Sequence, residues 1–366
     1  MRLLAGARPS AVAVLGLAAV APLFLSAGGT LLHNMVLAAV YVVMALGLNL
    51  IVGFAGLLDF GYVAFFAIGA YTAAYFASGF WGIHLNFLLV LGLAAATAAL
   101  VGAFIGVPTL RLRGDYIAVV TLAFGEITGQ IVANGRGIEI FGGTLTSGPI
   151  GIGPIDRIDL PLIGGFEALD LRPWYWFALA LAALALLATV NLRDSRIGRA
   201  WVAIRADESA AACAGIPIVR TKLLAYGTGG AFGGVAGAYF ASYFGFVNPT
   251  QFQFSFSIFI LAMIVLGGLG SIWGVVVGAV ALSAVNNYLL PDVLFDLPRK
   301  IGLDFDLSAI SSGIYGALLV IVMLVRPQGL VPAATPARRE ELSELQRRAR
   351  PSGPRPIGPA WKDAAL

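Results

Sequence analysis

Long apolar segments separated by short charged ones run along nearly the whole chain. Each apolar segment is close to the ~20 residues that an α-helix needs to cross the hydrocarbon core of a bilayer. The segments occupy residues 11–28, 31–52, 60–78, 85–107, 116–133, 174–191, 223–244 and 308–325. The pattern predicts an all-α, polytopic integral membrane protein, with an N-terminal span or anchor in residues 1–30 and a transmembrane domain in residues 31–326.

The first segment has a second interpretation. Arg2 and Arg8 precede an apolar run that ends in small residues, which is also the pattern of a cleaved signal peptide. We favour a retained anchor, because polytopic membrane proteins usually keep their first span.

A further apolar segment, residues 256–290, is too long for one comfortable span. As one helix, it places the loop 292–306 on the side of the basic loops and the arginine-rich tail on the opposite side. As two short helices with a hinge at Gly267, Gly268 and Gly270, it reverses both assignments. Lys and Arg in short loops mark the cytoplasmic face. The sequence therefore predicts two helices here, about ten transmembrane crossings in total, and both termini in the cytoplasm.

Composition and charge support this topology. Hydrophobic residues make up 59% of the 366 residues and charged residues only 11%, against about 25% in an average soluble domain, which excludes a soluble globule. In the predicted topology 18 basic residues lie on the cytoplasmic side and five on the outside. The 46 glycines indicate helices that pack closely through small faces, for example through Gly229, Gly233 and Gly237.

Three segments between or after the spans are too polar to cross a membrane. Residues 134–172 are rich in glycine and proline and are expected to form an ordered external loop with short strand-like pieces. Residues 193–222 form a basic cytoplasmic loop. Residues 327–366 form a basic cytoplasmic tail, rich in proline and arginine, whose composition predicts partial disorder. A solvated tail is the more common interpretation, and an interaction segment is the alternative.

The sequence lacks the patterns of several kinds of chemistry. None of the three lysines follows a glycine, so no ATP-binding P-loop is present and any ATP must be used by another chain. One cysteine, Cys213, and two histidines are too few for an internal disulfide or a metal cluster. We therefore expect no enzyme activity, no catalytic residue, no metal and no cofactor in this chain, and no nucleic-acid partner.

The candidate solute path rests on polar residues within the apolar segments. Glu126 is the one charged residue inside a predicted span. Such a residue is by default a functional candidate, because an ionised carboxylate in hydrocarbon costs several kcal/mol. Thr121 and Gln130 share its segment, and Asn49 lies in another. The alternative for each is a side chain that hydrogen-bonds a neighbouring helix.

The most specific local feature is the cytoplasmic loop, which from Asp194 has the sequence DSRIGRAWVAIRADESAAACAGIPIVRTK. Asp194 or Ser195 can cap a short amphipathic helix with Trp201 and Ile204 on its apolar side. Such a helix either lies on the membrane surface or docks into a groove of a cytoplasmic partner. The candidate contact residues of a docking helix are Arg199, Arg205, Asp207, Glu208 and, at its end, Gly215.

Several sequence blocks carry a family resemblance. They are LNLIVGFAGLLDFGYVAFFAIGAYTAAYF from Leu48, LRLRGDYIAVVTLAFGEI from Leu110, GRAWVAIRADESAAACAGI from Gly198, and FILAMIVLGGLGSIWGVVVGA with the later RPQGLV. In the same order, they resemble the branched-chain amino-acid ABC permease family, in its LivM-like branch. The resemblance covers residues 31–331.

This resemblance implies an inner-membrane permease subunit that imports branched-chain or related hydrophobic amino acids. It implies a second, homologous permease, two cytoplasmic ATPase subunits that use ATP, a periplasmic solute-binding protein, and a coupling loop at residues 193–222 that docks into the ATPases. The family also includes importers of urea and short amides. Those solutes, or a self-contained channel or secondary carrier, are the alternatives. The chain departs from the family in its long basic tail and in TSGPIGI at residues 146–152, where relatives have a TGGPNGI-like stretch.

Overall fold

The computed structural model describes residues 18, 20–23, 26, 28–109, 116–140, 143–160, 164–167, 170–287, 313, 316–317, 320, 324 and 329–331. The predicted spans 11–28 and 308–325, the loop 292–306 and the tail 327–366 therefore fall wholly or largely outside the described residues. All described residues belong to one unit, Met1–Pro332.

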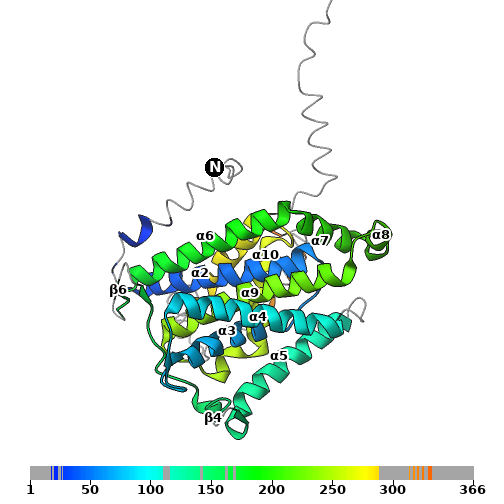
Figure 1. Ribbon diagram of the computed structural model, residues 1–366. Coiled ribbons are helices and arrows are strands. Elements are labelled where there is room, and N and C mark those ends of the chain that lie inside the picture. Colours follow the sequence, from blue (N-terminus) through cyan, green and yellow to red (C-terminus); the bar gives the residue numbers. More distant parts are fainter. Residues whose placement is uncertain are drawn as a thin grey trace, which may run out of the picture. The chain divides into compact units, whose positions relative to one another are not determined.

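Helices dominate the described part of the chain (Figure 1). The α-helices are α2 (Thr30–Leu48), α3 (Val63–Phe76), α4 (Phe87–Thr109), α5 (Tyr116–Asn134), α6 (Arg172–Asp194), α7 (Arg196–Ala206), α8 (Glu208–Cys213), α9 (Ile218–Phe244), α10 (Phe254–Gly267) and α11 (Ile272–Ala284). Shorter helical pieces are η1 (Ala21–Leu23), the π-helix η2 (Asn49–Phe54), η3 (Gly135–Gly137), η4 (Gly148–Ile150) and η5 (Pro249–Phe252). The strands are β1 (Ala77–Ser78), β2 (Ile83–His84), β3 (Glu139–Ile140), β4 (Gly143–Thr144), β5 (Asp159–Leu160) and β6 (Gly164–Gly165).

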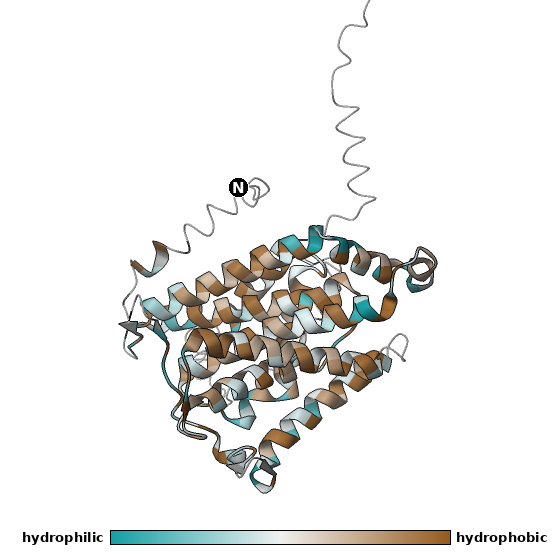
Figure 2. Cartoon of the chain, in the orientation of Figure 1, coloured by the Kyte–Doolittle hydropathy of each residue, from teal (hydrophilic) through white to brown (hydrophobic). Residues whose placement is uncertain are grey.

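The apolar helices confirm a multi-pass membrane protein. Four helical segments are long and apolar enough to cross a bilayer, namely Thr30–Phe54, Phe87–Pro108, Tyr116–Gly137 and Arg172–Asp194. Shorter apolar helices occur at Val63–Phe76, Phe254–Gly267 and Ile272–Asn287. Figure 2 shows hydrophobic residues along α4 and α6 and hydrophilic residues where α6 meets α7.

Helix α2 is the core helix of the bundle and packs against α6, α9 and α11. Residues 40–48 are all buried, because a helix that is apolar on every side has no face to present to water. In its most apolar stretch 89% of the residues are buried, against 28% in the corresponding stretches of α4 and α5. Helices α4 and α5 therefore present most of their surface to lipid or to a partner.

The small-residue face of α9 brings this helix close to its neighbours. An added methyl group at Gly229 would lie 2.9 Å from the carbonyl oxygen of Gly47 in α2. At Gly233 it would lie 2.9 Å from Cβ of Phe65 in α3. Such close approach requires small residues. The predicted packing of this face, which continues to Gly237, is confirmed.

The GGLGS segment, residues 267–271, separates α10 from α11. Gly268 has a φ of 118° and Gly270 a φ of 81°, which residues with a Cβ rarely adopt. Ser271 then caps α11, because its Oγ accepts a hydrogen bond from Gly274 N at 3.1 Å. The two helices pack against each other. The predicted division into two helices is thus confirmed, whereas a hinge motion at this segment stays a prediction.

The described parts of the connection between α5 and α6 carry the expected short strands. Strand β3 pairs with β4, and β5 with β6. Thr146 Oγ1 donates a hydrogen bond to Val132 O at 2.7 Å. Ile152 and Val247 exchange two backbone hydrogen bonds of 2.9 and 3.0 Å. These bonds hold the TSGPIGI stretch against the end of α5 and the connection that follows α9.

Candidate functional site

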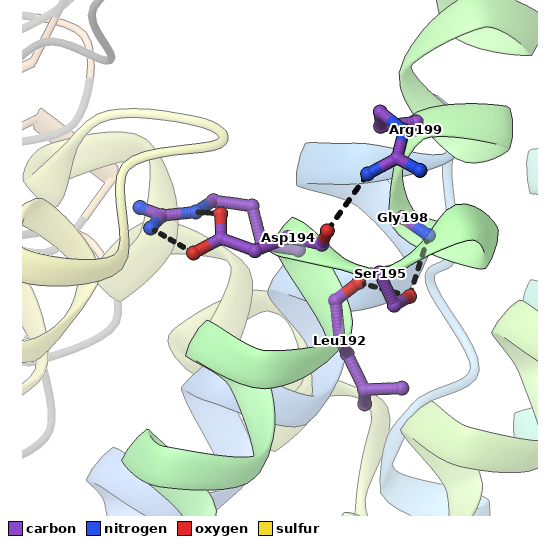
Figure 3. Close-up of polar contacts among 6 residues, drawn as sticks. Leu192, Asp194, Ser195, Gly198 and Arg199 are labelled. Atoms are coloured by element: carbon purple, nitrogen blue, oxygen red, sulfur yellow. Dashed lines mark hydrogen bonds and ion pairs between the residues drawn. The ribbon is translucent and has the colours of Figure 1, made fainter. Parts of the chain in front are cut away.

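The candidate coupling loop begins with a capped helix where α6 ends. Ser195 Oγ accepts a hydrogen bond from Gly198 N at 3.2 Å and donates one to Leu192 O at 2.7 Å (Figure 3). Of the two predicted caps, Ser195 therefore takes this role. Asp194 instead pairs with its neighbour Arg193, and its carbonyl oxygen accepts a hydrogen bond from Arg199 Nη1 at 2.9 Å.

The predicted single helix is wrong, because the loop forms two helices that meet at Asp207. This residue has an extended backbone, and its Oδ1 accepts hydrogen bonds from Ser209 N at 2.8 Å and Ala210 N at 3.0 Å. A carboxylate that binds free N–H groups starts a new helix. Asp207 is thus the N-cap of α8. The loop leaves α8 at Gly215, whose φ of 81° is left-handed.

The apolar side of these two helices packs within the chain. Trp201 is fully buried, and its Nε1 donates a hydrogen bond to Thr221 O in α9 at 2.8 Å. Ile204 and Ala211 are also buried. The predicted amphipathic pattern is confirmed, and the buried side fixes α7 against α9.

An ion pair fixes α8 to α9. Glu208 Oε1 lies 2.8 Å from Lys222 Nζ. The lysine is only 3% exposed, whereas the glutamate is exposed and faces the solvent side of the loop. A nearly buried ammonium group needs such a partner, because an unpaired charge there is strongly unfavourable.

A second basic side chain of this loop, Arg205 of α7, is exposed but reaches the end of η2. Arg205 Nη1 donates a hydrogen bond to the carbonyl oxygen of Gly53 in η2. Between these elements lies a small cavity of about 180 Å³. It is lined by residues 55–58, by Ile117 of α5 and by side chains of the coupling loop and α9.

The connection between η2 and α3 carries a buried carboxyl group, Asp59. Its Oδ1 accepts a hydrogen bond from Gly61 N at 2.8 Å, and the residue is 2% exposed. Burial raises the pKa of Asp59 to about 7, against the opposing effect of the hydrogen bonds from Gly61 and Thr121. The carboxyl group is therefore partly protonated near neutral pH.

The four candidate path residues do not lie together. Glu126 and Gln130 are exposed on one face of α5. Thr121 is buried, and its Oγ1 accepts a hydrogen bond from Phe60 N at 3.1 Å. Asn49 is buried, and its Oδ1 accepts a hydrogen bond from Gly270 N at 3.0 Å. The latter two side chains hold backbone segments together.

A cavity of about 430 Å³ lies between the start of α4 and the connection that joins α5 to α6. His84 Nδ1 and Asp156 Oδ2 lie 2.5 Å apart at its edge, and both side chains are about half exposed. Asn86, Arg157 and Asp159 also line it. This cavity has polar, accessible side chains at its edge, so it suits a polar or charged group.

Comparison with known families decides the class of the protein. The family described as "Branched-chain amino acid transport system / permease component" matches residues 30–323. The chain belongs to this family. As a family member it is a permease subunit of a transporter and not an enzyme.

Individual relatives agree with the family match. The permease is 37% identical over 349 residues to the "High-affinity branched-chain amino acid transport system permease protein LivM" of Escherichia coli (strain K12), covering 89% of this chain and 75% of the relative. It is 27% identical over 310 residues to the "High-affinity branched-chain amino acid transport system permease protein LivH" of Salmonella typhimurium, covering 82% of this chain and 93% of the relative. It is 28% identical over 221 residues to the "Ribose import permease protein RbsC" of Escherichia coli (strain K12), covering 55% and 68%. No solved structure matches the permease.

The sequence analysis missed two residues of the permease that the geometry makes prominent. Lys222 is one of three lysines in the chain and begins an apolar run, which signals a charge that needs a partner. Asp59 is the one charge between two apolar segments, in LLDFG. Neither lies inside a predicted span, so the pattern of spans does not single them out.

Proposed function

We propose that this chain is the permease subunit of an ATP-binding cassette importer that carries branched-chain or related hydrophobic amino acids across the bacterial inner membrane. Two separate cytoplasmic ATPase subunits supply the energy. The family match and the names of the relatives support the solute class. The observation that carries the coupling role is the pair α7 and α8, whose apolar side is packed inside the chain while polar residues remain on the outside.

In this proposal the ATPases bind the outer side of α7 and α8. Arg199 and Ser209 are exposed there, and Gly215 gives the loop a sharp exit. The inner side is connected to α9 through Trp201 and through the ion pair of Glu208. Movement of the loop is therefore passed to α9, whose glycine face lets it shift against α2, α3 and α4.

The exposed face of α5 is proposed to pair with a second, homologous permease. Ala123, Glu126, Ile127 and Gln130 are exposed on this face. A charged side chain at the centre of a membrane helix costs ~2.5–3.5 kcal/mol, so lipid is an unfavourable neighbour for Glu126. A partner subunit with a polar path between the two chains removes this cost. A periplasmic solute-binding protein would deliver the solute at the external end, where His84 and Asp156 lie.

Uptake by the reconstituted complex tests the function. Co-expression with neighbouring permease and ATPase genes should give a complex that accumulates leucine, isoleucine or valine in liposomes only with ATP and the binding protein. Replacement of Glu208 by Lys together with Gly215 by Val should abolish uptake while membrane insertion stays intact. Uptake by this chain alone would establish a channel or secondary carrier instead. Uptake of urea or short amides in place of leucine would change the solute class.

A further inference from the structure

Arg205 lies where the coupling loop meets the end of the core helix. Its guanidinium donates a hydrogen bond through Nη1 to Gly53 O, a bond between residues 152 positions apart in the chain. The aliphatic part of the side chain passes over Gly56, where an added methyl group would lie 2.7 Å from Arg205 Cγ. Both ends of this side chain are therefore in contact with the connection that follows α2.

The end of η2, where the Arg205 guanidinium lies, suits a positive charge. The continuous helix α2 and η2 ends at residues 54–56, and its last carbonyl groups lack partners within the helix. Two of them are satisfied by the backbone, since Ala55 N donates to Leu50 O and Leu57 N donates to Ile51 O. Gly53 O receives the arginine instead. A positive charge at this end also opposes the negative pole of the helix dipole.

The same guanidinium lies against the GGLGS segment. An added methyl group at Gly270 would lie 2.9 Å from Arg205 Nη1 and 3.1 Å from Gly53 O. Gly270 N is in turn held by Asn49 Oδ1. One side chain of α7 thus contacts both the end of α2 and the junction of α10 with α11.

The end of α10, where the GGLGS segment begins, is also bonded to residues 330 and 331. Leu330 N donates to Leu266 O at 2.9 Å and Val331 N donates to Gly267 O at 3.0 Å. The described contact between α7 and this junction is the one made by Arg205.

We propose that Arg205 is the positioning residue that ties coupling helix α7 to the junction of η2 with the GGLGS segment, so that displacement of α7 shifts α2, α10 and α11 together. This inference rests on the proposed function, in which ATPases bind α7 and α8. Arg205 differs from Arg199 of the same helix, whose guanidinium bonds only to the carbonyl oxygen of the nearby Asp194 in the contacts described. Both arginines are exposed, but of the two, Arg205 is the one whose described hydrogen bond leaves the coupling loop.

The assembled importer in liposomes tests this role through the amount of leucine taken up per ATP hydrolysed. Arg205→Ala should leave the ATPases bound and ATP hydrolysis largely intact, while uptake per ATP falls about tenfold, within the range of coupling between two sites. Arg205→Lys should restore part of the ratio, because it keeps the charge but not the planar fork. Arg193→Ala, which removes an arginine paired with the adjacent Asp194, is the control and should keep the ratio.

An unchanged ratio in Arg205→Ala would overturn the inference while leaving the proposed function intact. If Arg205→Ala does not accumulate in membranes, the same ratio of leucine uptake to ATP hydrolysis is measured for Arg205→Gln and Arg205→Lys. We expect this ratio to be lowest in Arg205→Gln, higher in Arg205→Lys and highest in the wild type. Equal ratios in all three proteins contradict the role. Failure of the wild-type chain to bind any ATPase would instead overturn the proposed function, and this inference with it.

Discussion

Glu208 Oε1 and Lys222 Nζ lie 2.8 Å apart, with the lysine nearly buried and the glutamate exposed. The pair joins the short helix α8 to the start of α9, which packs against α2, α3 and α4. The exposed partner is therefore accessible at the surface of the loop, while the buried partner belongs to the helix bundle. This asymmetry makes the pair a direct connection between the outer surface and the core.

Breaking this ion pair should lower stability. Glu208→Gln leaves the buried ammonium of Lys222 unpaired, at a cost on the order of 1–3 kcal/mol after allowance for the exposed glutamate. The double variant Glu208→Gln with Lys222→Met removes both charges and should regain most of the loss. The midpoint of thermal unfolding of the detergent-solubilised permease measures the loss and the recovery of stability. Equal midpoints for the single and double variants would contradict the interpretation.

The glycine face of α9 should not tolerate a methyl group. In Gly230→Ala the methyl would lie 2.7 Å from the carbonyl oxygen of Ala98, so α4 and α9 must move apart and the yield of folded permease should fall. The control is Gly92→Ala in α4, where the methyl meets nothing within 4 Å. This change should stabilise by up to about 1 kcal/mol, because alanine favours helix. Size-exclusion profiles recorded after heating compare how much of each variant remains folded.

Cysteine cross-linking should locate the second permease on α5. Cys213, the native cysteine, is first replaced by serine. Ala123→Cys should then form cross-links to the second permease, because Ala123 lies on the exposed face beside Glu126. Leu100→Cys is the control, since Leu100 is 71% exposed on α4 and is expected to face lipid. Equal cross-linking at both positions would remove the support for a specific α5 interface.

Asp59 should make stability depend on pH. Burial raises its pKa to about 7, above the ordinary value of about 3.9, so the folded chain binds this proton more tightly than the unfolded chain. Protonation of Asp59 therefore contributes its full share to the free energy of unfolding below about pH 4, and this share is lost as the pH rises through 7. Asp59→Asn should therefore raise the unfolding midpoint at pH 8 more than at pH 5. Asp159→Asn, on the exposed external loop, should keep the wild-type profile.

The sequence predicted the elements well and the contacts between them poorly. Apolar length located α2, α5, α6 and α9, and the glycines of residues 267–271 predicted the break between α10 and α11, because these signals are local. The division of the coupling loop at Asp207 also has a local signal, a helix-capping residue followed by glutamate. The bond from Arg205 to Gly53 could not be predicted, because 152 residues separate its partners and only the packing of the bundle brings them together.

The glycine face of α9 also limits how this sequence can change over generations. Every single-base change in a glycine codon that alters the amino acid adds at least a Cβ atom. At Gly230 that atom would meet the backbone of α4, so no one-step replacement leaves the packing intact. At exposed positions of α4 such as Leu100, which we expect to face lipid, many apolar residues serve equally well. Divergence within this transporter class should therefore accumulate on the outer surface of α4, while the face of α9 changes only when α2, α3 or α4 changes with it.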